Sequence, residues 1–390
     1  MRIGIFSDTY FPDINGVVTS LETLRLGLIE RGHEVFVVAN HNKLFELEQK
    51  DHLLLLPGLE LKWTFNNKMS IPYNLRAEKI IETMKLDVIH VQTEFGIGLL
   101  ARRMAKKLQI PLIYTYHTTW EDYTHYINPM HMKTVEKGSK NLVAILSKSL
   151  CKPARFVVTP SLKTKELLIS YGVKQAIKVI PTGLDLDRFE VTDAGHQQRL
   201  VIKQKYNLGD DELILIFVGR IGEEKGLDIL IDAFVDLCDI NVKLLIVGGG
   251  PQLKNYQDLI VDKGLQSQII MTDKVPNVEV PYYYQLADAF VSASMTETQG
   301  LTFIEAMASG CPVLGSDIAV LEDLVISGET GYMFNGSKEL ELLIRKLNEM
   351  SYEELDRMKK RAVQQVKPYD KEYFVEAIED LYLRAIANEG

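Results

Sequence analysis

Two glutamates flank a glycine and the start of a helical pattern in the second half of the chain. The stretch runs from Glu297 to Gly310 and reads ETQGLTFIEAMASG, with Glu297 and Glu305 eight positions apart. A helix start presents unpaired backbone N–H groups and the positive end of the helix dipole, and both suit a phosphate. Carboxylates beside a phosphate need a different partner, and sugar hydroxyls are the obvious one.

Two cations follow the first predicted strand of the second half. Arg220 ends that strand in VGRIGEEKGLD, and Lys225 lies five residues further on, near the next helix start. Two cations there suit a diphosphate better than a carboxylic acid or a neutral ligand. The alternative is that both are solvated loop charges. The stretch is not a P-loop, and VGGGP at 247–251 does not satisfy G-x-G-x-x-G; a close strand-to-helix connection explains these glycines more simply.

A histidine and a glycine loop are the candidates in the first half. His117 ends the predicted strand PLIYTYH, where it could hydrogen-bond a sugar or polarise a reacting hydroxyl; a structural histidine is the alternative. Gly16 lets the first strand-to-helix turn approach a ligand closely, unless it serves only a surface turn. Thr19 or Ser20 could cap the following helix. No H-E-x-x-H pattern occurs, so we expect no metal site.

Short apolar runs alternate with helical patterns along the whole chain. The runs that indicate strands are RIGIFS, HEVFVVAN, DVIHVQ, PLIYTYH, RFVVTPS, IKVIPTG, LILIFVGR, VKLLIVGGG, IIMTDKV, AFVSAS and CPVLGSD. Helical patterns include VTSLETLRLGLIERG, KGLDILIDAFVDL and GLTFIEAMASG. Apolar strands separated by helices indicate parallel sheets that are covered on both faces. The predicted fold class is therefore α/β, with doubly wound parallel sheets.

The length of 390 residues favours two domains of similar size. The alternation pauses between residues 183 and 209, which are polar and irregular. We expect Rossmann-like domains at 1–190 and 191–370, followed by a helix at 371–390 that packs back on the first domain. Two open α/β domains would bind a ligand in the cleft between them, outside the carboxyl ends of the strands.

The composition is that of a soluble globular protein, with 46% hydrophobic and 25% charged residues. Three well-separated cysteines fit a reducing cytoplasm and no disulfide framework. We expect no signal peptide and no membrane-spanning helix. Residues 1–190 hold 25 basic and 20 acidic side chains, whereas the remainder holds 19 and 33. This split predicts an anionic partner for the first half only, and the acidic second half argues against nucleic acid.

The order of these elements resembles glycosyltransferase family four, a large class of retaining, nucleotide-sugar-dependent enzymes with the GT-B fold. The resemblance covers almost the whole chain. Its most specific element is Glu297 to Glu305 followed by AMASGCPV. The stretches ETQG at 297–300 and YHTTWEDYTHYI at 116–127 look most like bacterial enzymes that glucosylate diacylglycerol, using UDP-glucose to form alpha-monoglucosyl-diacylglycerol. GDP-mannose is the less favoured donor.

The resemblance assigns a role to each candidate residue and implies that no cofactor is required. Glu297 would hold hydroxyls of the donor sugar and Glu305 the ribose. Arg220 and Lys225 would neutralise the leaving diphosphate, and His117 would face the transferred sugar. The remaining donor-binding positions would be Gly16, the amides of Gly300, Leu301 and Thr302, and, as a looser match, the backbone near Val275, which would hold the base.

A basic amphipathic helix is predicted over residues 133–152. Its basic arc consists of Lys133, Lys137, Lys140, Lys148 and Lys152. Its apolar side consists of Val135, Leu142, Leu146 and Leu150. Such a helix suits an anionic bilayer, although most amphipathic helices simply pack on their own core. Between residues 90 and 178 the chain holds 14 basic and 5 acidic side chains, which favours the bilayer.

The predicted reaction is retaining transfer of glucose to the 3-hydroxyl of 1,2-diacylglycerol, by a cytoplasmic enzyme held peripherally on the inner face of the cell membrane. No convincing carboxylate nucleophile is present, so a covalent glycosyl-enzyme is not implied. The alternatives are a transferase of the same fold with a soluble acceptor, a polysaccharide acceptor or another nucleotide sugar. An epimerase and a non-enzymatic binding module are more distant rivals. The sequence does not indicate an oligomeric state.

Overall fold

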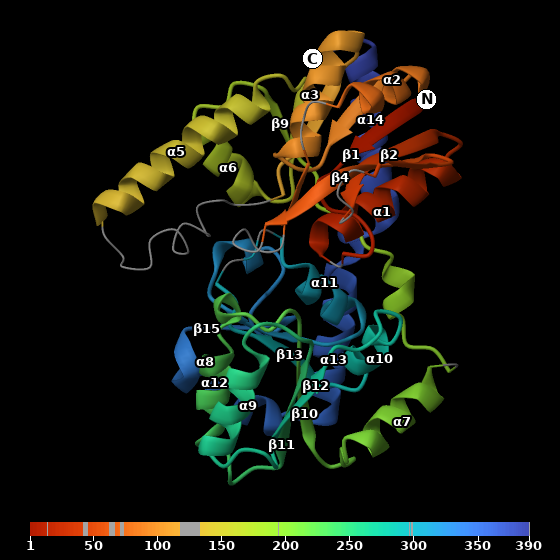
Figure 1. Cartoon of the computed structure of the whole chain (residues 1–390). Coiled ribbons are helices and arrows are strands. Elements are labelled where there is room, and N and C mark those ends of the chain that lie inside the picture. Colours follow the sequence, from red (N-terminus) through yellow and green to blue (C-terminus); the bar gives the residue numbers. More distant parts are fainter. Residues whose placement is uncertain are drawn as a thin grey trace. The chain divides into compact units, whose positions relative to one another are not determined.

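The computed structural model describes residues 1–13, 15–41, 46–61, 67–70, 74–117, 133–193, 195–295, 297 and 299–389, with the backbone alone for 59–61, 67–70 and 133–140. The chain divides into two compact units (Figure 1). The first comprises Met1–Leu184 together with Lys371–Gly390, and the second comprises Asp185–Asp370. Each is a helix-covered α/β unit whose central sheet is mainly parallel in the first unit and entirely parallel in the second, as the sequence predicts.

The first unit is built on a sheet with the strand order β3-β4-β2-β1-β6-β7-β8-β9, and β5 pairs with β4. Only β3 and β5 pair antiparallel with β4; the other pairings are parallel. The strands are β1 (Arg2–Phe6), β2 (Glu34–His41), β3 (Glu48–Lys50), β4 (Leu53–Leu61), β5 (Asn67–Ser70), β6 (Val88–Val91), β7 (Leu112–Thr115), β8 (Phe156–Thr159) and β9 (Ala176–Val179). The strand order reverses between β1 and β6.

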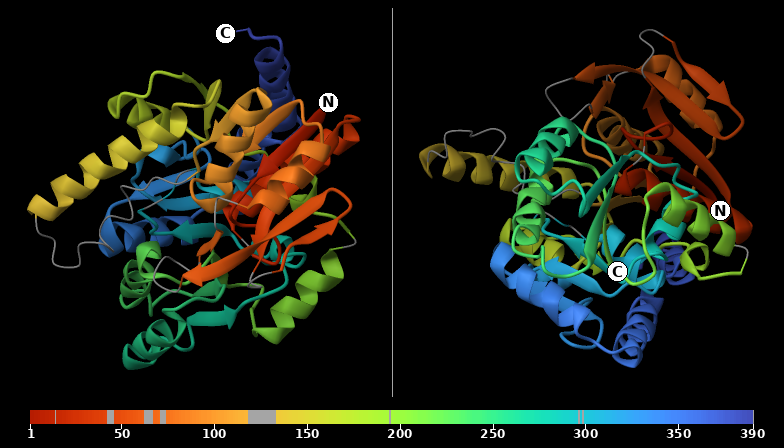
Figure 2. Two further views of the ribbon diagram at one scale, coloured as in Figure 1. Left: turned by 45° about the horizontal axis from the view of Figure 1, so that its top comes forward. Right: turned by 90° about the horizontal axis from the view of Figure 1, so that it is seen from below.

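Helices flank this sheet in the first unit. They are α1 (Gly16–Glu30), α2 (Leu75–Thr83), α3 (Gly96–Leu108), α5 (Lys133–Cys151), α6 (Leu162–Ser170) and α14 (Lys371–Ile386). The C-terminal helix α14 contacts α1, and Figures 1 and 2 show it in dark blue beside the red N-terminal elements. Its apolar face, which includes Phe374, Ile378 and Tyr382, is buried in one core with Ile3 and Leu24.

The second unit has a parallel sheet with the order β12-β11-β10-β13-β14-β15, which reverses between β10 and β13. Its strands are β10 (Leu213–Val218), β11 (Val242–Val247), β12 (Ile269–Asp273), β13 (Ala289–Ser292), β14 (Val313–Ser316) and β15 (Gly331–Phe334). Its helices are α7 (His196–Lys205), α8 (Leu227–Phe234), α9 (Leu253–Asp262), α10 (Val280–Tyr284), α11 (Leu301–Ala308), α12 (Gly336–Asn348) and α13 (Tyr352–Gln365). Four 3-10 turns, η2 (Leu186–Phe189), η3 (Glu223–Lys225), η4 (Ala319–Leu321) and η5 (Lys367–Tyr369), complete the part of this unit that is described.

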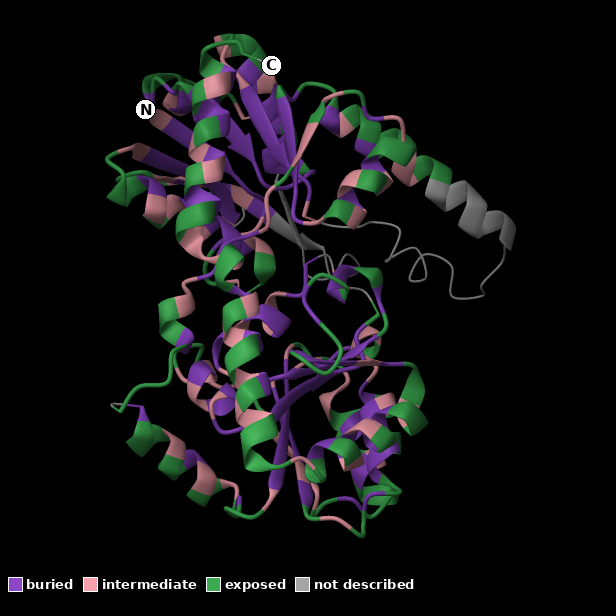
Figure 3. Ribbon diagram, turned by 180° about the vertical axis from the view of Figure 1, so that it is seen from behind, coloured by how far each residue is buried: buried purple, intermediate pink, exposed green. Residues whose placement is uncertain are grey.

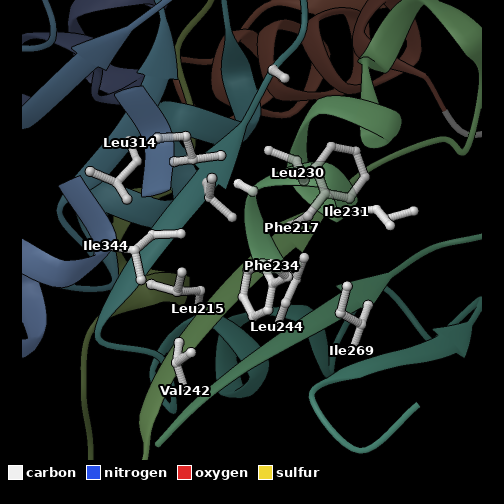
Figure 4. Packing of buried hydrophobic residues seen from close by; sticks show 14 of the residues in the cluster. Leu215, Phe217, Leu230, Ile231, Phe234, Val242, Leu244, Ile269, Leu314 and Ile344 are labelled. Atoms are coloured by element: carbon white, nitrogen blue, oxygen red, sulfur yellow. The ribbon is translucent and has the colours of Figure 1, made fainter. Parts of the chain in front are cut away.

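Apolar strands hold each sheet in place because both faces are covered. All six residues of β10 are buried, and Figure 3 shows the strands of both units mostly in purple. Figure 4 shows how Leu215 and Phe217 of β10 pack against Leu230, Ile231 and other residues from the neighbouring strands and helices. Burying each such side chain contributes about 2 kcal/mol. This core fixes the loops that leave the carboxyl ends of the strands.

Two features differ from the sequence prediction. The strands β3, β4, β5 and β15 are not in the predicted set; β3 and β5 are short and polar, so they lack the apolar run that marks a buried strand. The polar span at 183–209 is not wholly irregular, because α7 occupies His196–Lys205. A mostly exposed helix of this kind has little apolar periodicity to reveal it.

Candidate active site

The loops after β10 and β13 diverge where the second sheet reverses its strand order. In open α/β sheets ligands bind at such a switch point, outside the carboxyl ends of the strands. The loop after β10 carries Arg220 and, in η3, Lys225. The loop after β13 carries Glu297 and leads into α11. Two candidate cations and a carboxylate more than 70 residues further along the chain therefore lie at one edge of one sheet.

Lys225 and Glu297 form an ion pair across this switch point. The Lys225 Nζ lies 2.7 Å from the Glu297 Oε1 and donates a longer hydrogen bond of 3.3 Å to the Ser294 Oγ. The side chains are 21% and 14% exposed, so solvent screens the pair only in part. Direct pairing of this cation with this carboxylate is not predicted by the sequence, which assigns them to different groups of one ligand.

Arg220 also has a carboxylate partner within its own loop. Its Nη2 lies 2.5 Å from the Glu224 Oε1, and its side chain is 49% exposed while that of Glu224 is buried. Behind this loop, the backbone of Gly248 approaches that of Gly219 so closely that a Cβ on Gly248 would lie 1.9 Å from the Gly219 oxygen. The glycines after β11 therefore permit a tight contact between loops. This agrees with the interpretation of VGGGP as a close strand-to-helix connection.

The start of α11 presents backbone donors next to Glu297. Gly300 lies directly before the helix with a φ of 76°, a left-handed conformation that glycine adopts without strain. No side chain caps this helix, and among the described residues the amides of Leu301 and Thr302 have no acceptor. These are the unpaired N–H groups that the sequence predicts for an anion.

Glu305 lies one turn into α11 and is largely withdrawn from solvent. The Tyr284 hydroxyl of α10 donates a hydrogen bond of 3.1 Å to the Glu305 Oε2. Burial raises the pKa of Glu305 to about 7, although the Tyr284 bond and nearby Arg188 both lower it. Val275, the looser candidate, lies half-buried in the loop after the edge strand β12.

In the first unit His117 follows β7 and contacts Gln92, which follows β6. The His117 Nε2 lies 2.6 Å from the Gln92 Oε1. Burial lowers the pKa of His117 to about 4, so the imidazole is neutral near pH 7. The sequence does not predict Gln92, because a glutamine after a strand carries no distinctive spacing.

The first strand-to-helix turn differs in detail from the prediction. Asn15 caps α1 by accepting a hydrogen bond from the Val18 amide, so the expectation that Thr19 or Ser20 caps this helix is wrong. Both residues lie inside the first turns of α1 instead. Gly16 is the exposed first residue of the helix.

A buried carboxylate joins the two loops at the switch point of the first sheet. The Asp8 Oδ1 accepts from the Ile97 amide at 2.8 Å, and its Oδ2 accepts from the Thr93 hydroxyl at 2.7 Å. Asp8 therefore supplies the cap that α3 lacks at its own N-terminus. Burial raises the pKa of Asp8, while these hydrogen bonds oppose the rise.

Helix α5 exposes both charge and apolar surface. Lys148 on the helix and Lys152 just after it are exposed; the side chains of Lys133, Lys137 and Lys140 lie outside the described residues. Leu142, Ile145 and Leu146 are 51–66% exposed at helical spacing. In the views of Figures 1 and 2 this helix, in yellow, extends away from the sheet of its unit. Among the described helices none is long and apolar enough to span a bilayer.

Comparison with known proteins decides the family. The model of a family described as "Glycosyltransferase Family 4" matches residues 14–188, and that of "Glycosyl transferases group 1" matches residues 198–365. An alpha-monoglucosyldiacylglycerol synthase of Acholeplasma laidlawii is 34% identical over 99% of this chain and 98% of its own length. The chain belongs to glycosyltransferase family 4. The predicted family, fold and class of enzyme are thereby confirmed.

Further comparisons agree with this glycosyltransferase assignment. An alpha-monoglucosyldiacylglycerol synthase of Streptococcus pneumoniae is also 34% identical, over 87% of this chain and 76% of its own length. Among solved structures, HepE of Anabaena in complex with UDP superposes with a TM-score of 0.75 over 98% of this chain and 99% of its own. Its sequence identity of 17% makes this a likeness of fold.

A glycosyltransferase must stabilise the charge of a leaving group and orient hydroxyls. The second unit offers two cations, the open amides of α11 and two glutamates for these tasks. No group of three or more metal-type ligands occurs in the part of the chain that is described. The residues at this edge of the sheet can therefore hold an anion by ion pairing and backbone hydrogen bonds.

Proposed function

We propose that this glycosyltransferase moves glucose from UDP-glucose to the 3-hydroxyl of 1,2-diacylglycerol, with retention, and forms alpha-monoglucosyl-diacylglycerol at the membrane surface. The observation that carries the proposal is the 34% identity to the Acholeplasma laidlawii synthase, which extends over nearly all of both chains. The enzyme would work at the cytoplasmic face of the cell membrane, as a peripheral protein.

The donor is proposed to lie along the switch point of the second sheet. Arg220, Lys225 and the amides at the start of α11 would hold the diphosphate. Glu297 would bind hydroxyls of the sugar and Glu305 those of the ribose. The complex of HepE with UDP supports a uridine nucleotide. The backbone near Val275 would hold the base of the nucleotide.

The chemical step is proposed to proceed without a covalent intermediate. Glu297, whose Oε1 lies 2.7 Å from the Lys225 Nζ, is better explained as a binder of sugar hydroxyls than as a nucleophile. The departing phosphate oxygen would take the proton of the acceptor hydroxyl on the same face of the sugar. Lys225 and Arg220 would then stabilise the charge that grows on the diphosphate, which is where most of the rate enhancement would arise. His117, which is neutral, would hydrogen-bond the transferred sugar.

Helix α5 is the proposed contact with the membrane that holds the acceptor lipid. A helix that packs on its own core hides its apolar face, but Leu142, Ile145 and Leu146 are all more than half exposed. Lys148 lies in the last turn of the helix, and the exposed Lys152 directly follows its end. Apolar side chains that enter the headgroup region and lysines that meet anionic lipid are the two forces that hold a peripheral helix on a bilayer.

The experiment that tests the proposal pairs nucleotide sugars with defined acceptors. The purified protein is incubated with UDP-glucose, UDP-galactose or GDP-mannose and vesicles of anionic phospholipid with or without diacylglycerol, and products are identified by mass spectrometry. We expect one hexose on diacylglycerol from UDP-glucose alone, with retained configuration by NMR. Transfer to a soluble acceptor in preference to diacylglycerol, or from another nucleotide sugar, would overturn the proposal.

A matched pair of variants separates the donor and acceptor sides. Lys225→Ala should lower transfer to every acceptor by about 100-fold or more. The double variant Leu142→Ser and Leu146→Ser should lower flotation with anionic vesicles at least about tenfold, because each leucine contributes roughly 1–2 kcal/mol when it is buried in lipid. It should leave the affinity for UDP, measured by calorimetry in detergent, unchanged. Unchanged flotation would exclude α5 as the membrane contact.

A further inference from the structure

Four polar side chains form two rows on one face of the first sheet. His90 and Gln92 are two positions apart along β6 and its extension, and Thr115 and His117 are two positions apart along β7 and its extension. Side chains two positions apart lie on the same face of a sheet. The backbone stays extended past both strand ends, because the Gln92 amide bonds the Phe6 oxygen and the Tyr116 amide bonds the Val158 oxygen.

His90 and Thr115 form the inner row of this face, and the His90 ring is held from both sides. The His90 Nε2 lies 2.7 Å from the Thr115 Oγ1, and its Nδ1 lies 2.7 Å from the hydroxyl of Tyr382 on α14. All three side chains are buried. Burial lowers the pKa of His90 to about 3, with a smaller contribution from His117. The inner row is therefore a fixed neutral support for the outer one.

The outer row consists of Gln92 and His117. Gln92 is 2% exposed, so its amide has little room to exchange partners with water. Its oxygen accepts only, and the 2.6 Å approach to Nε2 therefore requires a hydrogen on that nitrogen. A neutral imidazole carries one ring hydrogen, so Nδ1 is left as an acceptor. Among the described residues Nδ1 has no hydrogen-bond partner.

We propose that Gln92 is a positioning residue that holds His117 in the tautomer with its hydrogen on Nε2, so that Nδ1 accepts a hydrogen bond from a hydroxyl of the transferred sugar. The inference rests on the proposed function for the identity of that hydroxyl, but not for the tautomer. It assigns His117 the role of an acceptor and excludes it as a cation or a general acid. Gln92 acts through His117 and does not itself touch the sugar.

The carboxylates of Asp8 and Glu94, which follow neighbouring strands, do not contribute to the lowered pKa of His117, because burial alone causes that shift. Asp8, after β1, bonds the Ile97 amide and Thr93, and Glu94, after β6, accepts from the Tyr114 hydroxyl at 2.8 Å. His90 is held as described above and stays neutral. In the described part of the chain Gln92 is therefore the group that sets the hydrogen position on His117.

The first test reads the tautomer directly in the ligand-free protein. Long-range nitrogen–proton NMR spectra of histidine-labelled protein, with His117→Ala to assign the signal, should show hydrogen on Nε2 alone from pH 5 to 8. Gln92→Leu should give a mixture of both tautomers. Hydrogen on Nδ1 in the unaltered protein, or an unchanged tautomer in Gln92→Leu, would overturn the proposal whatever the enzyme's substrate proves to be.

The second test uses kinetics. Gln92→Leu should lower kcat about tenfold, the loss expected for one buried hydrogen bond, with a smaller change in the KM for UDP-glucose. Gln92→Glu should introduce a fall in kcat as the pH decreases from 8 to 6, because a carboxylate at this distance favours protonated His117, which no longer accepts a bond. The control variant is Gln109→Glu, at an exposed position, and it should leave the pH dependence of kcat unchanged.

The pH dependence distinguishes positioning from a general structural defect. In the double variant Gln92→Glu and His117→Ala the acid fall should disappear, since the group that titrates is gone. If the fall persists without His117, or if Gln92→Glu has the flat profile of the control, the proposal is wrong. Should the unaltered enzyme fail to use UDP-glucose at all, the proposed function fails while the NMR test still decides the role of Gln92.

Discussion

Replacing Glu305 by glutamine should stabilise the second unit at alkaline pH and weaken its function. Glu305 is partly buried on α11, and among the described residues its hydrogen-bond donor is the neutral Tyr284 hydroxyl at 3.1 Å. An ionised carboxylate in this position is costly because no ammonium or guanidinium of the described residues bonds it directly. Glutamine keeps the size and the acceptor oxygen while removing the charge.

The size of the effect follows from the pKa of Glu305, which burial raises from 4.5 to about 7. Between these values the folded protein holds a proton that the unfolded chain has released. Stability is therefore fully present below about pH 4.5 and is lost as the pH rises through 7. At 1.36 kcal/mol for each pH unit, the loss is about 3 kcal/mol by pH 8.

The assay compares the unaltered protein with Glu305→Gln at pH 5 and pH 8 in the absence of nucleotide. Urea unfolding is followed by circular dichroism, and hydrogen exchange of α11 peptides assigns the transition of the second unit. We expect Glu305→Gln to be about as stable as the unaltered protein at pH 5 and more stable by roughly 3 kcal/mol at pH 8. Both units carry other titrating groups, but these cancel in the difference.

The reasoning would be refuted by a difference between the two proteins that stays constant, within about 1 kcal/mol, from pH 5 to pH 8. It would also be refuted if Glu305→Gln were the less stable protein at pH 8. UDP binding gives an independent check under the proposed function. The variant should bind UDP more weakly at pH 8, because a neutral amide is a poorer acceptor for ribose hydroxyls than a carboxylate.

Three further predictions concern other parts of the chain. Lys225→Ala should lower kcat by about 100-fold or more with less effect on UDP affinity, as steady-state kinetics and calorimetry will show; an unchanged kcat would exclude its role. Asp8→Ala should reduce the unfolding free energy of the first unit by about 1–3 kcal/mol in urea, since a buried amide loses its acceptor. Gly248→Ala should cost roughly 3 kcal/mol or more in thermal unfolding, because its Cβ would meet the Gly219 oxygen, whereas Gly264→Ala, which meets nothing, should cost about 1 kcal/mol.

The fold was predictable because buried parallel strands appear in the sequence as continuous apolar runs. Runs such as LILIFV and VKLLIV are apolar at nearly every position, and they recur between helical patterns. Ligands in such folds bind at loops that follow the strands, so Arg220 and His117 could be named as candidates by their place after an apolar run. The short strands β3 and β5 lack this signal, because they pair at the margin of a sheet where polar side chains are tolerated.

Pairings among the candidate residues of each unit were not predictable in the same way. Lys225 and Glu297 meet because β10 and β13 are neighbours in the sheet. The apolar periodicity of a strand does not indicate which other strand lies beside it. Gln92 and His117 meet for the same reason across β6 and β7. Asn15 rather than Thr19 caps α1 because the chain enters the helix earlier than the apolar pattern begins. Sequence locates the loops, and sheet order decides which side chains touch.

Glu297 and Glu305 differ in their physical surroundings. Glu297 has an ammonium partner at 2.7 Å, whereas the hydroxyl of Tyr284 is a neutral partner for Glu305. A ligand hydroxyl that approaches Glu297 must therefore share the carboxylate with Lys225. A ligand hydroxyl that approaches Glu305 supplies a second donor to a partly buried carboxylate. Ribose binding should consequently lower the pKa of Glu305 and release a proton near pH 7. Proton release on UDP binding, measured in two buffers of different ionisation enthalpy, should be present in the unaltered protein and absent in Glu305→Gln.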